Sequence, residues 1–181
     1  MQQNDFTQMV QQRQSCRAYG PERPTMEQWR AMVAVASQAP SACNSQPWHF
    51  VAVNDPALAA AVGAATRLHG LNGFTEDCGA FIVLCEVPPR LSERVLAFMK
   101  RDAFVSIDIG IAAAHLCYAA REQGLDTCIM GCFDEPKLRT LLQLPAEHRV
   151  RLVLAVGKAT DPTLRPKKRR PLAENLTCFG E

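Results

Sequence analysis

One continuous apolar run, Ala80-Phe81-Ile82-Val83-Leu84-Cys85, restricts the possible folds of this chain more than any other feature. A strand with one face in water alternates polar and apolar residues, whereas a strand covered on both faces does not. The run shows no alternation and is ended by Pro88-Pro89. It therefore predicts a central strand in a sheet that carries other elements on both faces.

Helical and strand patterns alternate on either side of this run. Thr25 and Gln28 have the spacing of a capping box, and an apolar face continues from there to a stop at Pro40. Asp55 and Asp134 are placed to cap two further helices. Other helices are predicted at about 5–12, 92–100 and 104–123, and other strands at about 50–53, 127–130 and 150–156. This order predicts an α+β or α/β sandwich with helices on both faces of the sheet, and it leaves the strand order open.

Length and composition favour a single domain over residues 1–181. Hydrophobic residues make up 48% and charged residues 21%, which is a globular composition. The net charge of +2 gives the whole molecule no field that would attract nucleic acid or an anionic membrane. Because no apolar run reaches about 18 residues and no signal-peptide pattern is present, we expect a cytoplasmic protein with neither partner.

The eight cysteines form no Cys-x-x-Cys pair, and most of them lie in apolar runs. Cys128 and Cys132 look most like a pair, but no nearby histidine completes a zinc site. The pattern predicts buried free thiols and no metal site.

Three separated polar segments carry the candidate chemistry. The first, Arg13-Gln14-Ser15-Cys16-Arg17, offers two guanidinium groups, an amide and a hydroxyl near the end of a predicted helix. Arginine donates in a fork that suits phosphate oxygens and ring carbonyls. A solvated helix end would have the same composition, so this segment alone leaves both interpretations open.

The second segment, Pro40 to Phe50, places compact hydrogen-bonding side chains between a helix end and a strand. Ser41, Asn44 and Gln46 can donate and accept at the edge of a planar polar ligand. A turn whose Ser and Asn side chains bond their own backbone is an equal alternative. Trp48 is interpreted as a core or interface anchor.

The third segment, Arg165 to Leu172, has five positive charges and too few apolar residues for the core. It predicts an anion site, or alternatively a solvated tail or a nucleic-acid patch. Between these segments, Gly131 would let backbone N–H groups approach a ligand without an obstructing Cβ. Asp108 and His115 are possible proton donors in a long apolar helix, where a buried, satisfied polar role is favoured.

In this order the segments resemble the FMN-dependent nitroreductase family, in its small NAD(P)H nitroreductase type. The likeness spans nearly the full chain, and its motifs begin at Arg13, Pro40, Asp108, Gly124, Gly131, Arg165 and Phe179. Gln14 departs from the family pattern, in which a basic residue is commoner. We expect this departure to alter a hydrogen bond without abolishing the phosphate site.

The resemblance implies an α+β, three-layer sandwich with a central mixed sheet, helices on both faces and a homodimer with FMN at the subunit interface. The implied cofactor-binding residues are Arg13, Gln14, Ser15, Arg17, Pro40, Ser41, Ala42, Asn44, Gln46, Met130, Gly131, Lys167 and Arg169. In the family, the loop at Pro40 reaches the flavin bound mainly by the other subunit. The backbone near Gly131 lies on the N5 side of the ring, and the basic segment grips the FMN phosphate.

The implied activity is electron transfer from NAD(P)H through FMN to a nitroaromatic, quinone or related small acceptor, by a ping-pong mechanism. No side chain is implied as catalytic, because flavin N5 carries the hydride. A specialised flavoenzyme for enoate reduction, dehalogenation or flavin destruction would keep the FMN residues and differ in the segment over the ring, for which 68–76 and 87–101 are the candidates. A non-enzymatic flavin-binding or anion-binding module is the alternative outside enzymes.

Overall fold

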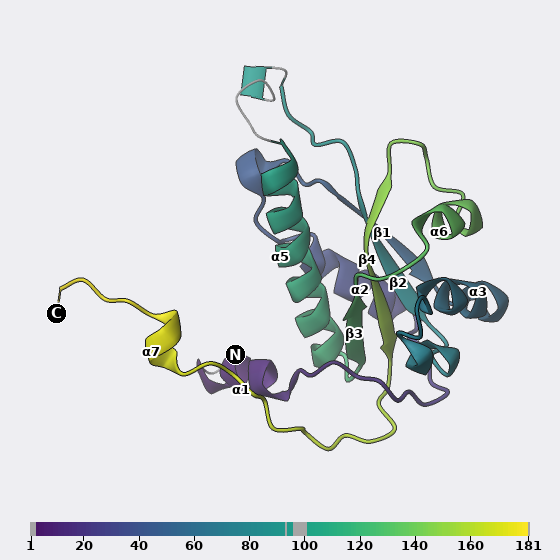
Figure 1. The fold of residues 1–181 in the computed structure, drawn as a ribbon, viewed down its shortest axis with the longest axis horizontal. Coiled ribbons are helices and arrows are strands. Elements are labelled where there is room, and N and C mark those ends of the chain that lie inside the picture. The colour runs from purple at the N-terminus through teal and green to yellow at the C-terminus, as the bar shows by residue number, and fades with distance from the viewer. Residues whose placement is uncertain (1–2, 93, 96–100, 181) are drawn as a thin grey trace.

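A computed structural model describes residues 3–92, 94–95 and 101–180 (Figure 1). The elements, in which η marks a 3₁₀ helix, are α1 (Gln3–Gln12), α2 (Met26–Ala36), η1 (Ala42–Asn44), β1 (Trp48–Val53), α3 (Pro56–Thr66), η2 (Gly73–Glu76), β2 (Phe81–Glu86), α5 (Arg101–Glu122), β3 (Asp126–Met130), α6 (Glu135–Leu141), β4 (Arg149–Gly157) and α7 (Leu172–Asn175). The helix predicted at about 92–100 lies mostly outside the described residues.

The sheet has the strand order β1-β2-β4-β3, and each neighbouring pair of these strands is antiparallel. The apolar run forms β2, which lies between β1 and β4, and Phe81 to Cys85 are completely buried. The predicted central strand is therefore confirmed. Parallel pairing, which a mixed sheet requires, is confined among the described residues to an isolated bridge between Ser15 and Thr127.

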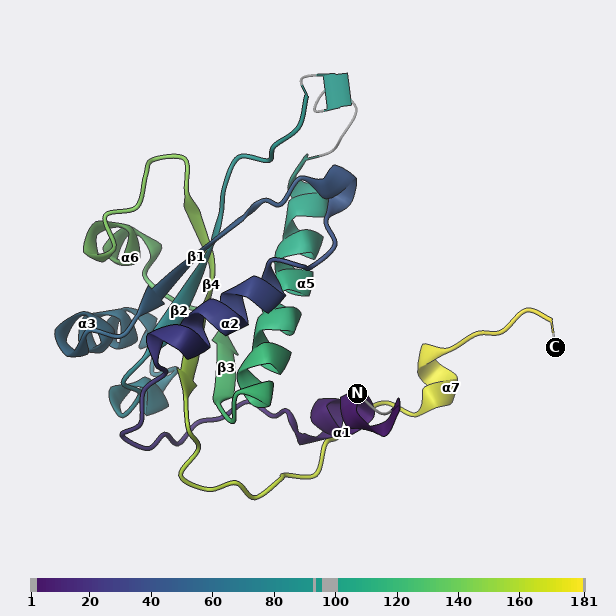
Figure 2. The same cartoon turned by 180° about the vertical axis from the view of Figure 1, so that it is seen from behind.

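Helices cover both faces of the sheet, as predicted (Figures 1 and 2). On one face α2 and α5 pack together, and Trp29 and Leu116 join Ile82 of β2 in a buried cluster. On the other face α3 and α6 contribute Val62 and Leu138 to a second cluster. Full burial of each large apolar side chain contributes about 1.5–3 kcal/mol, so the two clusters hold the three layers together.

Side-chain caps begin three helices where the sequence predicts them. Thr25 Oγ1 accepts from the Gln28 N–H at 3.2 Å, and Gln28 Oε1 accepts from the Thr25 N–H at 2.9 Å, which completes the capping box. Asp55 and Asp134 accept from backbone N–H groups in the first turns of α3 and α6, at 2.8 and 3.0 Å. Each cap contributes about 1 kcal/mol, which is enough to determine where a short helix starts.

The longest described helix is α5, which contacts α1, α2 and the sheet. Its stretch Phe104–Glu122 is long and apolar enough to cross a membrane by length and composition alone, and half of that window is buried inside the fold. Core helices pass the same test, so this composition is weak evidence for a membrane span. The helix predicted at about 104–123 is confirmed.

After β4 the chain forms an extended arm, defined here as residues 160–180. The arm passes α1 and carries α7 away from the sheet (Figures 1 and 2). Its apolar side chains lie open, with 72% of Leu172 and 95% of Phe179 exposed. The interior of the single chain therefore does not include the arm.

The cysteines are all free thiols: Cys16, Cys78, Cys85, Cys117 and Cys128 are buried, Cys132 is half-buried, and Cys43 and Cys178 are exposed. The prediction of buried thiols holds for five of the eight and is wrong for Cys43 and Cys178, which lie in a surface loop and in the arm. Burial raises the pKa of Cys78 and of Cys85 to about 11, so both are protonated at neutral pH. Within the described ranges, no group of three or more potential metal ligands is found.

Candidate functional site

The segment Arg13 to Arg17 leaves the end of α1 and is attached to the edge strand β3. The Cys16 N–H donates to Thr127 O at 3.0 Å, beside the parallel bridge from Ser15. The buried Tyr19 hydroxyl lies 3.1 Å from Cys16 O and 3.3 Å from Ala155 O, and donates to these carbonyls. These bonds hold the backbone of the segment against the sheet, while Arg13 stays half-buried and Arg17 exposed.

The arm returns to this segment and closes a cavity of about 320 Å³ against it, named here the basic cavity. Its lining residues are Arg13, Gln14, Ser15, Arg17, Arg165, Pro166, Lys167, Lys168 and Arg169. Two of the three predicted segments, about 150 residues apart, thus meet at one place. The six cofactor residues predicted in these two segments all line the cavity, and so does Lys168.

Positive charge in the basic cavity has no carboxylate partner within the described part of the chain. The described residues form the ion pairs Arg121–Asp126, Arg151–Glu86 and Lys158–Glu22, and none of these pairs includes a residue that lines the basic cavity. Desolvation, and then the charges of Arg13 and Arg169, hold the pKa of Lys167 below its usual value. An anion placed between like positive charges stabilises them, so the cavity favours an anionic ligand.

Lys167 also contacts the C-terminal turn of α1. Its Nζ donates to Val10 O at 2.7 Å. The carbonyls of a helix C-terminus carry partial negative charge and attract cations. This contact helps to hold the ammonium group beside the segment that follows α1.

Gln14 is engaged with the arm through both ends of its carboxamide. Its Nε2 donates to Thr163 O at 2.9 Å, and its Oε1 accepts from the backbone N–H and from Nε of Arg165 at 3.2 and 3.3 Å. Arg165 donates in addition to Ser15 O. We expected Gln14 to contact a cofactor and assigned no separate role to Arg165, because nothing local in the sequence relates the two residues.

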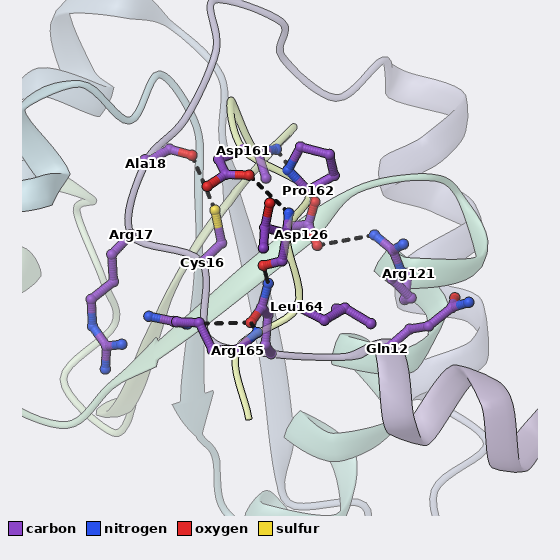
Figure 3. A pocket seen from close by; sticks show the side chains of 13 residues that line it. Gln12, Cys16, Arg17, Ala18, Arg121, Asp126, Asp161, Pro162, Leu164 and Arg165 are labelled. Atoms are coloured by element: carbon purple, nitrogen blue, oxygen red, sulfur yellow. Dashed lines mark hydrogen bonds and ion pairs between the residues drawn. The ribbon is translucent and has the colours of Figure 1, made fainter. Parts of the chain in front are cut away.

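A second cavity of about 320 Å³ lies on the other side of this junction and is shown in Figure 3. Arg121 pairs with Asp126 Oδ1 at 3.1 Å on one side of it, and Asp126 Oδ2 accepts from the Ala159 N–H at 3.3 Å, just before the arm begins. Burial raises the pKa of the Cys16 thiol in its wall, so this group is a poor nucleophile at neutral pH. These contacts tie the root of the arm to the body.

The loop from Pro40 to Gln46 is held in an uncommon backbone conformation. Cys43, Asn44 and Gln46 have positive φ values of 52°, 53° and 46°. Gln46 Nε2 donates to Asn44 Oδ1 at 3.1 Å, and the Gln46 N–H donates to Ser41 Oγ at 3.0 Å. Three non-glycine residues at positive φ are costly, and such strain gathers at ligand sites, which agrees with the predicted role of the loop.

Asp108 of α5 accepts hydrogen bonds from this loop. It is only 3% exposed; its two oxygens each accept from the Ala42 N–H at 3.2 Å, and Oδ2 accepts from Ser45 Oγ at 3.4 Å. The buried, satisfied polar role favoured for Asp108 is confirmed. His115 is half-buried, with Nδ1 2.9 Å from Ile111 O in its own helix.

The other predicted residues do not line the basic cavity of the same chain. The loop lies near the first turns of α5, whereas the two segments that line the cavity lie beyond its last turns (Figures 1 and 2). The Met130 side chain is buried in the core, so only its backbone is available to a ligand. Space for a Cβ exists at Gly131, so packing within the chain does not require glycine there, and the open space is compatible with a ligand's approach.

An apolar groove runs between α1, α2 and α5. This cavity, of about 540 Å³, is lined by Phe6, Met9, Val35, Ile107, Gly110, Ile111, Ala114, His115, Tyr118, Ala119 and Glu122. Phe6 and Ile107 are 54% and 59% exposed, and the Phe6 ring meets that of Tyr118 edge-on at 5.8 Å. Exposed large apolar side chains gathered in one groove are typical of a binding surface.

Sequence relatives agree with this architecture. Protein DrgA of Synechocystis is 28% identical over 198 residues, which cover 95% of this chain and 91% of that protein. The oxygen-insensitive NADPH nitroreductase of Helicobacter acinonychis is 24% identical, with 98% of each chain covered. The iodotyrosine deiodinase of Thermotoga neapolitana is 27% identical, with 85% of this chain and 88% of that protein covered.

Solved structures show the same fold. A nitroreductase-like protein from Streptococcus mutans gives a TM-score of 0.85 at 22% identity and covers 98% of this chain and 99% of its own. An FMN-dependent nitroreductase from Clostridium difficile gives a TM-score of 0.71 at 19% identity and covers 96% and 98%. The model of the Nitroreductase family matches residues 10–158, which is most of the chain. The chain therefore belongs to the nitroreductase family and is an oxidoreductase with the nitroreductase fold.

Proposed function

We propose that this oxidoreductase binds FMN and passes electrons from NAD(P)H to small acceptors such as nitroaromatics or quinones, in a ping-pong sequence. The basic cavity carries the proposal, because cations from two distant segments converge there without a carboxylate partner among the described residues. Guanidinium and ammonium groups donate charge-assisted hydrogen bonds to phosphate oxygens, so the terminal phosphate of FMN fits this donor set. An FMN-dependent protein among the structural relatives supports the choice of cofactor.

Each part of the site has a separate task in this proposal. Arg13, Ser15, Lys167 and Arg169 would hold the phosphate, and the polar loop from Ser41 to Gln46 would contact the edge of the ring system. Bound FMN would supply hydride acceptance from NAD(P)H and electron delivery to the acceptor. The protein groups bind, orient and limit the access of water, so no side-chain nucleophile or acid–base pair is needed.

The absorbance spectrum of the purified protein tests the redox function directly. We expect bound-flavin bands that bleach when NADH or NADPH is added without oxygen and recover when a nitroaromatic or quinone is added. A protein that shows no flavin absorbance after incubation with FMN and removal of the unbound flavin would contradict the proposal. Flavin that binds but is not reduced by either nucleotide would instead indicate a non-enzymatic binding module.

A specialised flavoenzyme is the second candidate, because a deiodinase lies among the relatives at 27% identity. Both candidates predict that NAD(P)H bleaches the flavin. They differ in the acceptor, so parallel reoxidation by a nitroaromatic, a quinone, a halogenated phenol and an enone separates them. Faster recovery by at least about tenfold with the halogenated phenol or the enone would favour the specialised enzyme.

We also propose that two copies associate through the apolar groove. The loop from Pro40 to Gln46 is remote from the basic cavity of its own chain, and a second copy would bring the loop of one chain to the cavity of the other. Burial of the groove residues would also remove the exposed apolar side chains from water. The assembled site would then use segments of both chains.

The oligomeric state of Ile107→Glu checks the association. A carboxylate buried in an apolar interface loses its hydration without gaining a partner. We therefore expect the dissociation constant of the dimer to rise by at least about 100-fold and a monomer to appear in light scattering. Met26→Glu is the matched control, because Met26 is also 59% exposed but does not line the groove. An Ile107→Glu protein with the unchanged molecular mass would rule out this groove as the interface.

A further inference from the structure

The arm depends on a few side-chain contacts for its place beside the basic cavity. It has no regular secondary structure between β4 and α7, and its residues from Thr160 onward are exposed. Within the described residues, the bonds that join it to the Arg13–Arg17 segment are those of Gln14 and the one from Arg165 to Ser15 O. The Thr160 N–H also donates to Ala18 O at 3.1 Å at the root of the arm, and Lys167 Nζ donates to Val10 O at 2.7 Å. The bonds of Gln14 and Arg165 therefore hold the stretch of the arm that lies between these two points.

A carboxamide is chemically suited to hold an extended chain. It offers a donor and an acceptor side by side, and Gln14 uses the donor on Thr163 O and the acceptor on the Arg165 N–H. Lysine or arginine at this position would have no acceptor for that N–H, and alanine would have neither group. The pair of bonds therefore places the arm backbone in one register relative to the helix end.

The bonds that Gln14 and Arg165 form between the arm and the Arg13–Arg17 segment are named here the clamp. The clamp lies close to the proposed phosphate ligands. Lys167 follows Arg165 by two residues, a reach of about 7 Å along the chain. The same Arg165 side chain bonds Gln14 Oε1 and Ser15 O, so it joins the arm to the opposite wall of the cavity. Loss of these bonds would favour movement of Lys167 away from the like charge of Arg13, against its remaining bond to Val10 O.

We propose that Gln14 is a positioning residue, which sets the affinity of the basic cavity for FMN by holding the arm rather than by contacting the cofactor. The inference rests on the proposed function for its ligand, and on the observed clamp for its mechanism. The geometry also explains why an uncharged residue lies in a cation-rich cavity. The Gln14 carboxamide holds the arm that carries Lys167 and Arg169, and it adds no further positive charge to the cavity.

Two measurements on the full chain test the proposal. The first is the rate of tryptic cleavage after Lys167, Lys168 or Arg169 without FMN, followed by mass spectrometry of the intact protein. The second is the FMN dissociation constant, from quenching of flavin fluorescence. For Gln14→Ala we expect cleavage in the arm and the dissociation constant each to rise roughly tenfold, because at least two hydrogen bonds are lost.

Gln12→Ala is the matched control. Gln12 lines the second cavity two residues away, and its carboxamide forms no hydrogen bond with the described residues. We expect both quantities to change less than about twofold in this variant. Retention of the thermal midpoint in both variants would show that the fold is intact.

Unchanged cleavage in Gln14→Ala would overturn the clamp. Faster cleavage with unchanged FMN affinity would overturn the positioning role, because the arm would then move without affecting the ligand. If the unaltered protein fails to bind FMN, the proposed function fails separately. The dissociation constant for inorganic phosphate, compared between the same variants, then decides whether Gln14 positions the anion site.

Discussion

Changing Arg13 and Arg169 together to alanine is expected to weaken FMN binding by at least about 100-fold, because each guanidinium is proposed to form a charge-assisted bond worth about 1.5–3 kcal/mol to the phosphate. The two residues come from opposite walls of the basic cavity, so neither is compensated by its own segment. The thermal midpoint without FMN should change little. Arg13 is half-buried, Arg169 is exposed, and neither belongs to a core cluster. Fluorescence titration with FMN and a melting curve of the apoprotein measure both effects.

A double variant with the same loss of charge is the control. Arg30→Ala with Arg170→Ala removes two exposed arginines outside the cavity lining. We expect the FMN dissociation constant of that protein to rise less than about threefold, through the weaker general field alone. If a folded Arg13 and Arg169 double variant retained full flavin, the phosphate assignment would be wrong.

Replacement of Asp108 by alanine is expected to destabilise the fold by about 2 kcal/mol, because it leaves the Ala42 N–H and the buried Ser45 hydroxyl without an acceptor. For a chain of this size the midpoint should fall by about 4–8 °C. The same change removes the support under the strained loop. We therefore expect a larger KM for the electron acceptor as well as a lower melting temperature.

Asp55→Ala separates these two effects. Asp55 caps α3 with one bond of 2.8 Å, so its loss should cost about 1 kcal/mol without disturbing the loop. Asp108→Asn keeps one oxygen as an acceptor and should lie between the wild type and Asp108→Ala. If Asp108→Ala changed only stability, to the same extent as Asp55→Ala, Asp108 would have no part in positioning the loop.

Features that depend on neighbouring residues were predicted correctly from the sequence. The unbroken apolar run predicted β2, and the Thr25 capping box predicted the start of α2. Each depends on contacts or burial that a few successive residues specify. The start of β1 was predicted two residues late, at Phe50 instead of Trp48, because the half-buried Trp48 is held as a strand by pairing with Glu86 across the sheet.

The candidate site was only partly predictable. Residue types suited to an anion identified the Arg13 and Lys167 segments separately, and the resemblance to a family supplied their common ligand. The contacts of Gln14 with the arm were not predicted, since its partners Thr163 and Arg165 are 149 and 151 residues away. No local pattern distinguishes an amide that binds a ligand from one that binds a distant backbone.

The local elements, the apolar faces and the supply of cations could be read from the sequence, because each of these follows from the chemistry and spacing of adjacent residues. Tertiary structure alone decided that the arm closes the basic cavity and that Asp108 lies under a loop 66 residues before it. Such contacts depend on the packing of the layers against the sheet, which brings distant segments together. Their partners are therefore selected by packing of the whole chain.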